Sequence, residues 1–145
     1  MQDAIAKAAV LIEALPYMQQ FRDETVVVKF GGSIMENPEG VRSILQDVAF
    51  MACVGMRPVI VHGGGKAISR AMKEAGMKPE FRRGLRVTDE ESIRVVEDVL
   101  NHEVNENLVR ILDGFQCRSR GIHGDDILAA VQRREQDPES GEEVD

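Results

Sequence analysis

The sequence predicts an α/β fold in which a mostly parallel sheet carries helices on both faces. Two short runs rich in β-branched residues, 26–30 and 58–62, have the composition of buried parallel strands, and a helical pattern follows each run. Strands that alternate with helical patterns indicate parallel pairing through crossover helices. Folds of this kind bind ligands beyond the carboxyl ends of their strands. Both runs end there in consecutive glycines, 31–32 and 63–65.

The N-terminal half of the chain contains two helical patterns. Residues 4–21 predict an amphipathic helix, and a kink or a break is expected at Pro16 because proline lacks the N–H that a helix interior uses. Asn37 has the side chain of an N-cap, and Pro38 suits the first helical position. A second helix is therefore expected to begin there and to close at Gly55.

A third helix is expected to begin near Lys66, after the second glycine run. Its apolar residues keep helical spacing, and Gly76 fits the position just past its end. The stretch 77–87 that follows is basic and shows no regular pattern, so an irregular loop is expected there.

A long fourth helix follows. Residues 88–91 (Thr-Asp-Glu-Glu) have the pattern of a capping box, and Gly114 is expected to end the helix. Residues 115–122 and 127–132 are strand candidates. The acidic segment 135–145 predicts a solvated loop or hairpin.

Composition excludes several classes of function. The 145 residues carry a formal net charge of −7 and only 4% aromatic residues, which argues against a nucleic-acid or anionic-membrane surface. No stretch has the length and apolarity of a membrane span or a signal peptide. Cys53 and Cys117 show no paired spacing and are expected to be reduced. A cytoplasmic protein is expected.

Lys29 is the candidate catalytic residue. An unpaired ammonium is costly inside an apolar strand, so a lysine there suggests that its charge is used. Only Phe30 separates it from Gly31-Gly32, at the strand end that is expected to face a ligand. The alternative is a solvated lysine near the end of a strand.

The second glycine run predicts an anion-binding loop. Backbone N–H groups and the N-terminus of a following helix favour phosphate, although a plain flexible turn is the alternative. The run is not a Walker A loop, because Ile60 occupies the earlier glycine position and Ala67 follows Lys66. It is not a dinucleotide fingerprint either, because Ile68 replaces the third glycine.

Arg86 is the candidate for holding an acid, because its planar guanidinium matches a carboxylate and Gly84 beside it allows close approach. The three histidines share no metal-ligand spacing, and no residue is assigned to a metal. A lysine and glycine loops around a phosphoryl group, with an arginine on an acid, suit phosphoryl transfer. A carboxylate acceptor is ionised at neutral pH and needs no general base.

Four motifs together resemble the acetylglutamate kinase group of the amino-acid kinase family, over nearly the whole chain. The motifs are Lys29-Phe30-Gly31-Gly32-Ser33, His62-Gly63-Gly64-Gly65, Gly84-Leu85-Arg86-Val87-Thr88-Asp89 and Val104-Asn105-Glu106-Asn107-Leu108-Val109. The resemblance implies ATP-dependent phosphorylation of the γ-carboxylate of N-acetyl-L-glutamate, a step of arginine biosynthesis, with Mg²⁺ entering with ATP.

The same resemblance implies roles for individual residues. Lys29 stabilises the transferring phosphoryl group. The backbone amides of Gly31, Gly32 and Gly64 bind phosphoryl oxygens, and those of Gly64 and Gly65 bind the acyl substrate. Arg86 holds the α-carboxylate of the substrate.

Residues 10–17 resemble the extra N-terminal helix of arginine-inhibited, hexameric members of the group. Residues 1–24 are accordingly expected to form a helical extension, and 25–145 a partial kinase domain that binds acetylglutamate. Tyr17 is implied as a contact for L-arginine, and a homo-oligomer, dimer or hexamer, is implied for the full protein. An ordinary amphipathic helix docked on its own domain is the alternative.

Members of the family are roughly twice as long as this chain, as two-lobe enzymes are. The motifs of the nucleotide-binding lobe do not occur before Asp145, and Asp125 stands where the family often has lysine. The chain is therefore expected to be a truncated or partial sequence, and inactive alone. Two other interpretations stay open: a kinase for N-acetyl-α-aminoadipate, and a non-catalytic lobe that binds an acylated amino acid or a partner kinase chain.

Overall fold

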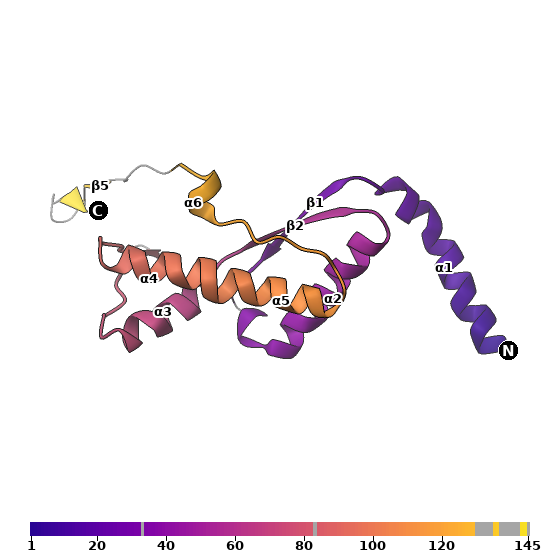
Figure 1. Cartoon of the computed structure of the whole chain (residues 1–145), viewed down its shortest axis with the longest axis horizontal. Helices are drawn as coiled ribbons and strands as arrows, with labels where there is room; N and C mark the ends of the chain where they lie inside the picture. Colours follow the sequence, from indigo (N-terminus) through magenta and orange to yellow (C-terminus); the bar gives the residue numbers. More distant parts are fainter. Residues whose placement is uncertain (33, 83, 130–134, 137–142, 145) are drawn as a thin grey trace. The chain divides into compact units, whose positions relative to one another are not determined.

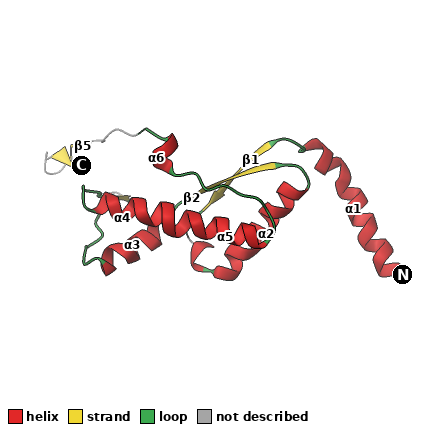
Figure 2. Ribbon diagram, viewed as in Figure 1, coloured by secondary structure: helices red, strands yellow, loops and turns green. Residues whose placement is uncertain are grey.

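The structure, a computed structural model, alternates helices with short strands and describes residues 1–32, 34–82, 84–129, 135–136 and 143–144 (Figure 1). The chain divides into two compact units, residues 1–62 with 111–118 and residues 63–110 with 119–145. The mixed α/β class predicted from the sequence is confirmed (Figure 2). None of the helices in these described ranges has the length and apolarity of a membrane-spanning segment.

The first unit is built around a two-stranded parallel sheet joined by a crossover helix. Its elements are α1 (Gln2–Gln20), β1 (Thr25–Phe30), the 3-10 turn η1 (Ile34–Glu36), α2 (Pro38–Cys53) and β2 (Arg57–His62). The register pairs Thr25 with Arg57 and runs in step to Phe30 opposite His62. The two predicted strands and their parallel pairing are therefore confirmed.

Helix α2 begins and ends where local chemistry predicts. The Asn37 side chain accepts a hydrogen bond from the Gly40 backbone N–H at 3.1 Å, and Pro38 occupies the first helical position. Gly55 follows the helix with φ +96°, a conformation that favours glycine. The helix packs against β2. The core of this unit consists of Phe30, Val41, Leu45, Val48 and Leu112.

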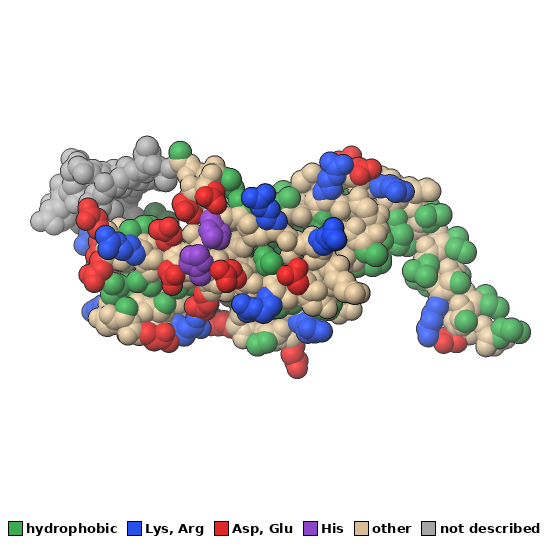
Figure 3. All heavy atoms as spheres, viewed as in Figure 1, with side chains coloured by type: hydrophobic (Ala, Val, Ile, Leu, Met, Phe, Trp, Pro, Cys, Tyr) green, Lys and Arg blue, Asp and Glu red, His purple; other side chains and the backbone are tan. Residues whose placement is uncertain are grey.

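Helix α1 runs without interruption from Gln2 to Gln20, so of the kink or break expected at Pro16 the break does not occur, and the kink stays a prediction. Proline removes one backbone hydrogen bond and crowds the preceding turn, but the turns on either side keep their helical geometry. None of the residues of α1 is buried. Hydrophobic side chains consequently show on its surface in Figure 3, and they include Ile5, Val10, Leu11, Ile12, Leu15 and Tyr17.

The second unit is mainly helical, with two short antiparallel pairings. Its elements are α3 (Gly65–Glu74), β3 (Phe81–Arg82), β4 (Leu85–Arg86), α4 (Ser92–Asp98), the π-helical segment η2 (Val99–Asn105), α5 (Glu106–Gly114, which continues into the first unit), α6 (Gly124–Ile127), β5 (Glu135–Gln136) and β6 (Glu143–Val144). Strand β3 pairs with β4, and β5 with β6. The second pairing confirms a hairpin within 135–145. The core of this unit consists of Ile68, Met72, Val99, Val104 and Leu108.

The long predicted helix is present as α4, η2 and α5, which follow one another from Ser92 to Gly114. Its cap differs from the prediction by one residue. Asp89, rather than Thr88, exchanges hydrogen bonds with Ser92, and the Thr88 hydroxyl donates to the Arg86 carbonyl instead. The π-helical turn in the middle was not predicted, since hydrophobic spacing does not distinguish it from an α-helix.

The strand expected at 115–122 is wrong. This segment has no regular structure, and the Ile122 carbonyl accepts a hydrogen bond from the Asn105 side chain at 3.1 Å instead of joining a ladder. The strand expected at 127–132 is wrong at its start, because Ile127 ends α6 and Leu128 and Ala129 are in no strand. Residues 130–132 lie outside the described residues.

Candidate functional site

The carboxyl ends of β1 and β2 lie side by side in the first unit. Phe30 pairs with His62 at the last position of the parallel register. Gly31-Gly32 follows the first strand and Gly63–Gly65 follows the second. Both glycine segments therefore leave the sheet at the edge where α/β folds bind ligands.

Lys29 lies on an exposed face of this sheet. Side chains alternate along both strands, and Val27, Val59 and Val61 are exposed on the face that they share with Lys29. The expectation of fully buried strands is therefore wrong, since within the described residues nothing covers that face. Among the same residues the side chain of Lys29 makes no hydrogen bond or ion pair. Its ammonium group is consequently accessible to a ligand.

The glycines at the strand ends differ in what they contact. At Gly31, Gly32, Gly63 and Gly65, an added Cβ would meet no described atom within 4 Å, and none of the four has a positive φ. Neither packing nor backbone strain within the described chain requires glycine at these positions. A ligand that approaches the backbone closely would require it.

At position 64, in contrast, packing within the protein explains the glycine. It is buried, and an added Cβ would lie 2.8 Å from Leu100 Cδ2 and 3.5 Å from Val104 Cγ2. The glycine lets the start of α3 pack closely on the η2 part of the long helix, with which α3 is in contact.

Arg86 reaches the second glycine segment within the second unit. It lies on β4, in a hairpin whose turn includes Gly84 at φ +82°. Its Nη2 donates to the Gly65 carbonyl at 3.0 Å and to Ser69 Oγ at 2.7 Å. The guanidinium is thereby fixed beside the first turn of α3, which begins at Gly65. Two of the predicted site residues, Gly65 and Arg86, are brought together.

The remaining predicted residues are divided between the units. Lys29, Gly31 and Gly32 belong to the first unit, as does Tyr17, which is exposed on α1. Gly64 belongs to the second unit, together with Gly65 and Arg86. The assembly of all of them into one site, and each of their roles, stays a prediction.

Sequence reasoning missed Ser69 and Phe81 at this site. Ser69 lies four residues after Gly65 on α3, and its hydroxyl donates to the Gly65 carbonyl at 2.9 Å. The Phe81 ring lies against the Arg86 guanidinium, with Cζ 4.7 Å from the ring centroid. The helical i, i+4 spacing from Gly65 could have indicated Ser69. The antiparallel pairing of Phe81 with Arg86 had no signal in the sequence.

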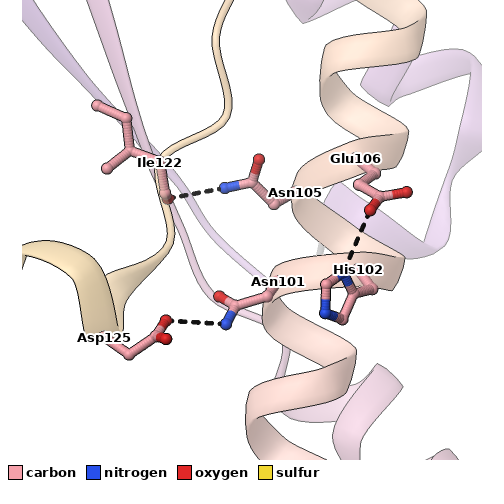
Figure 4. A network of polar contacts seen from close by, with 6 residues as sticks. All are labelled: Asn101, His102, Asn105, Glu106, Ile122 and Asp125. Carbon is pink, nitrogen blue, oxygen red and sulfur yellow. Dashed lines mark hydrogen bonds and ion pairs between the residues drawn. The ribbon is translucent and has the colours of Figure 1, made fainter.

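The η2 turn presents polar side chains to the segment 121–125 (Figure 4). The Asn101 amide is buried and donates to Asp125 Oδ1 at 3.0 Å, while Asn105 donates to the Ile122 carbonyl. His102 lies 3.2 Å from Glu106 and edge-on to His123. Single π-turns often mark functional sites, and here the turn anchors the segment 121–125.

The described charged groups of the second unit form surface contacts. Arg70 forms an ion pair with Glu103, and that hydrogen bond, with the negative charge of Glu103, raises the pKa of Arg70. The hydroxyl and backbone N–H of Ser92 lower the pKa of Asp89. Within the described ranges, no three His, Cys, Asp or Glu side chains are grouped to hold a metal ion.

The fold is that of an α/β protein in which glycine segments follow both parallel strands and an arginine is fixed beside the second segment. The sequence profile of the amino acid kinase family matches residues 24–144. The chain belongs to that family.

Within that family, the chain is similar to acetylglutamate kinases. The acetylglutamate kinase of Campylobacter jejuni is 45% identical over 137 residues, 93% of this chain and 49% of its own length. The acetylglutamate kinase of Akkermansia muciniphila is 43% identical over 141 residues, 97% of this chain and 47% of its own. This chain therefore spans about half the length of the curated relatives it matches.

One solved structure has a fold similar to that of this chain. The N-acetylglutamate synthase of Neisseria gonorrhoeae, solved with coenzyme A and N-acetyl-glutamate, has a TM-score of 0.60 and 29% identity. The match covers 74% of this chain and 25% of the synthase chain.

Proposed function

We propose that this chain is the acceptor-binding part of an acetylglutamate kinase, which transfers the γ-phosphoryl group of ATP to the γ-carboxylate of N-acetyl-L-glutamate in arginine biosynthesis. The kinases similar to more than nine-tenths of the chain support this assignment. The structural observation that carries it is the 3.0 Å hydrogen bond from Arg86 to the Gly65 carbonyl. It fixes a cation beside the glycine segment that follows β2, where an acidic acceptor can be held.

The proposed reaction needs positioning and charge rather than a base. An oxygen of the γ-carboxylate forms a bond to the γ-phosphorus of ATP, and the bond from that phosphorus to the bridging oxygen breaks. ADP leaves with the electron pair. The carboxylate is already ionised at neutral pH, because an ordinary glutamate has a pKa of about 4.3. Lys29 stabilises the charge on the transferring group, and its accessible ammonium supports that role.

The glycine segments provide the backbone donors. We assign phosphoryl oxygens to the amides of Gly31, Gly32 and Gly64, and the acceptor to those of Gly64 and Gly65. The open space around Gly31, Gly32 and Gly65 supports this assignment. Arg86 binds the α-carboxylate of the acceptor. The carbon chain of the acceptor then separates Arg86 from the reacting γ-carboxylate.

Mg²⁺ is proposed to enter with ATP rather than through a cage of protein ligands. Magnesium keeps several waters and is commonly bound by substrate phosphates with one or two carboxylates. The described residues, which contain no group of three side chains placed for a metal, are compatible with that mode. In the whole enzyme we propose a mostly parallel sheet with helices on both faces, and a cytoplasmic location.

Residues 1–24 are proposed as an oligomerisation extension, and 25–145 as the partial kinase domain. Helix α1 buries none of its residues and exposes a set of large apolar side chains, which is typical of a protein contact surface. A homo-oligomer, dimer or hexamer, would cover them. Tyr17 is proposed to contact L-arginine as an inhibitor of the assembled enzyme.

Two alternative functions make different predictions. A kinase for N-acetyl-α-aminoadipate would need the same groups and a pocket longer by one methylene. A non-catalytic lobe would bind an acylated amino acid, or a partner kinase chain, without transferring phosphate. The exposed sheet face that includes Val27, Val59 and Val61 is the observation that favours a partner chain.

The proposal is tested by trapping the acyl phosphate product with hydroxylamine, using the protein as its source organism produces it, with ATP and Mg²⁺. Hydroxamate is expected to form faster with N-acetyl-L-glutamate than with N-acetyl-α-aminoadipate. Lys29→Ala is expected to lower the rate by about 10²–10³-fold, and Lys73→Ala, an exposed change on α3, to leave it unchanged. Hydroxamate from neither acceptor, or an undiminished rate with Lys29→Ala, would overturn the assignment.

A further inference from the structure

The Arg86 guanidinium is held by four neighbours in the second unit. Nη2 donates to Ser69 Oγ at 2.7 Å and to the Gly65 carbonyl at 3.0 Å. Nη1 lies 3.0 Å from the sulfur of Met72, which is a buried residue of α3. The guanidinium lies over the ring of Phe81, with 4.7 Å from Cζ to the ring centroid. Together these four contacts restrict the orientation of the guanidinium.

The two Nη2 contacts account for both hydrogens of that nitrogen. Two hydrogens are left for a ligand, the single one on Nε and one of the two on Nη1. An arginine fixed in this way presents its remaining donors in one orientation, so a ligand need not order the side chain on binding. A lysine at this position would lack the planar fork that makes these simultaneous contacts.

Ser69 does two things with one hydroxyl. Its hydrogen goes to the Gly65 carbonyl at 2.9 Å, a back-bond that helical serines often make. Its oxygen accepts from Arg86. The first contact fixes the hydroxyl on α3, and the second uses it to fix the arginine. A serine that made only the first contact would contribute to α3 but would not hold Arg86.

We propose that Ser69 and Phe81 are positioning residues, which hold the guanidinium of Arg86 ready for the carboxylate of the acceptor. The inference rests on the proposed function of Arg86 as the carboxylate-binding group. Neither residue touches the reacting atoms. Ser69 sets the position of Nη2 relative to the first turn of α3, and Phe81 sets the plane of the guanidinium.

The first test measures the motion of Arg86 without any ligand, by ¹⁵N relaxation of its Nε–Hε group in the 145-residue chain. In the unaltered protein the order parameter is expected near ~0.85, as for rigid backbone, and below ~0.6 in Ser69→Ala. Phe81→Leu is expected to lower it as well. Ser69→Thr, which keeps a hydroxyl able to reach the Gly65 carbonyl, is expected to restore it. Equal order parameters in the unaltered protein and in Ser69→Ala would overturn the proposal.

The matched controls remove the same kinds of side chain elsewhere. Ser43→Ala removes an exposed hydroxyl on α2, and Phe50→Leu removes a ring that is 53% exposed, against 54% for Phe81. Both are expected to leave Arg86 unchanged. A loss of order with these variants equal to that with Ser69→Ala would also overturn the proposal.

The second test measures binding of N-acetyl-L-glutamate and of its α-carboxamide analogue by calorimetry. Ser69→Ala is expected to raise the Kd for the acid about tenfold, and Phe81→Leu about threefold. The Kd for the carboxamide is expected to stay the same in both variants. An unchanged or lower Kd for the acid in Ser69→Ala would overturn the proposal. Failure of the unaltered protein to bind the acid would count against the proposed function, and the relaxation test would then decide the role of Ser69 by itself.

Discussion

Three hydrogen bonds join Asp89 and Ser92 at the start of the longest described helical segment, and one of them runs from the Ser92 hydroxyl to the Asp89 carbonyl at 3.2 Å. The Ser92 backbone N–H donates to Asp89 Oδ1 at 2.7 Å, and the Asp89 backbone N–H donates to Ser92 Oγ at 2.8 Å. This reciprocal pattern satisfies two backbone donors that a helix start leaves without partners. Ser92 is buried, whereas Asp89 is exposed. The segment that begins here provides Leu100, on which Gly64 packs.

Loss of the Ser92 hydroxyl is expected to destabilise the fold. Ser92→Ala leaves the Asp89 N–H without its acceptor, and the loss of a capping hydroxyl typically costs about 1 kcal/mol. The measurement is the free energy of unfolding in urea. Ser43→Ala on the exposed face of α2 is the control and is expected to change it by less than about 0.5 kcal/mol. Equal effects of the two changes would show that the cap contributes nothing.

The same pair predicts a dependence of stability on pH. The pKa of Asp89 is lowered in the folded protein, first by the Ser92 hydroxyl and then by the Ser92 backbone N–H. Its contribution is therefore complete above the unfolded pKa of about 3.9 and is lost as the pH falls through the lower, folded pKa. Asp89→Asn keeps a capping side chain but cannot titrate. Its stability is expected to fall less steeply below about pH 4 than that of the unaltered protein. A dependence of stability on pH that Asp89→Asn leaves unaffected would refute the linkage.

Alanine is expected to destabilise the fold at Gly64 and not at Gly65. At Gly64 a Cβ would lie 2.8 Å from Leu100 Cδ2, so the side chain of Leu100 must shift. Gly64→Ala is expected to reduce the free energy of unfolding by about 1–3 kcal/mol, as overpacking does. At Gly65 a Cβ would enter open space. Gly65→Ala is expected to leave stability within about 0.5 kcal/mol while weakening acetylglutamate binding. The opposite ranking of stabilities would contradict the close packing at Gly64.

Two prolines provide a matched comparison of helix positions. Pro16 lies inside α1, where proline costs about 3 kcal/mol relative to alanine, and Pro38 lies at the first position of α2, where proline is favoured. Pro16→Ala is expected to raise the helical circular dichroism and to slow amide exchange in α1. Pro38→Ala is expected to leave the helical signal the same or lower it. A gain in helicity from Pro38→Ala equal to that from Pro16→Ala would be inconsistent with these positions.

Much of the fold could be predicted because short-range chemistry determines it. Asn37 and Pro38 begin α2, Gly76 follows α3 with φ +76°, and Gly114 ends α5. Each of these residues begins or ends a helix through contacts with residues close to it in the sequence. The local sequence is therefore sufficient to predict the helix boundary. The strands were recognisable for a similar reason, since β-branched residues in a short run ended by glycine favour no other structure as strongly.

What could not be predicted depends on contacts between distant residues. The exposure of Val27, which is 64% exposed, depends on which elements cover the sheet and not on β1 itself. The missing strand at 115–122 reflects a competing hydrogen bond from Asn105, 17 residues before Ile122. The contact between Ser69 and Arg86 also spans 17 residues. The hydrophobic periodicity of a segment indicates which element it forms, but not which distant residues that element contacts.

We expect an acidic acceptor to bind where Arg86 meets the second glycine segment. The most direct measurement is a titration of the ¹⁵N-labelled chain with N-acetyl-L-glutamate, followed by NMR. Saturable shifts are expected at the backbone N–H groups of Gly64 and Gly65 and at Arg86 Nε–Hε, and Arg86→Ala should abolish the backbone shifts. Saturable binding that leaves these three groups unshifted, or no saturable shift anywhere, would contradict the account.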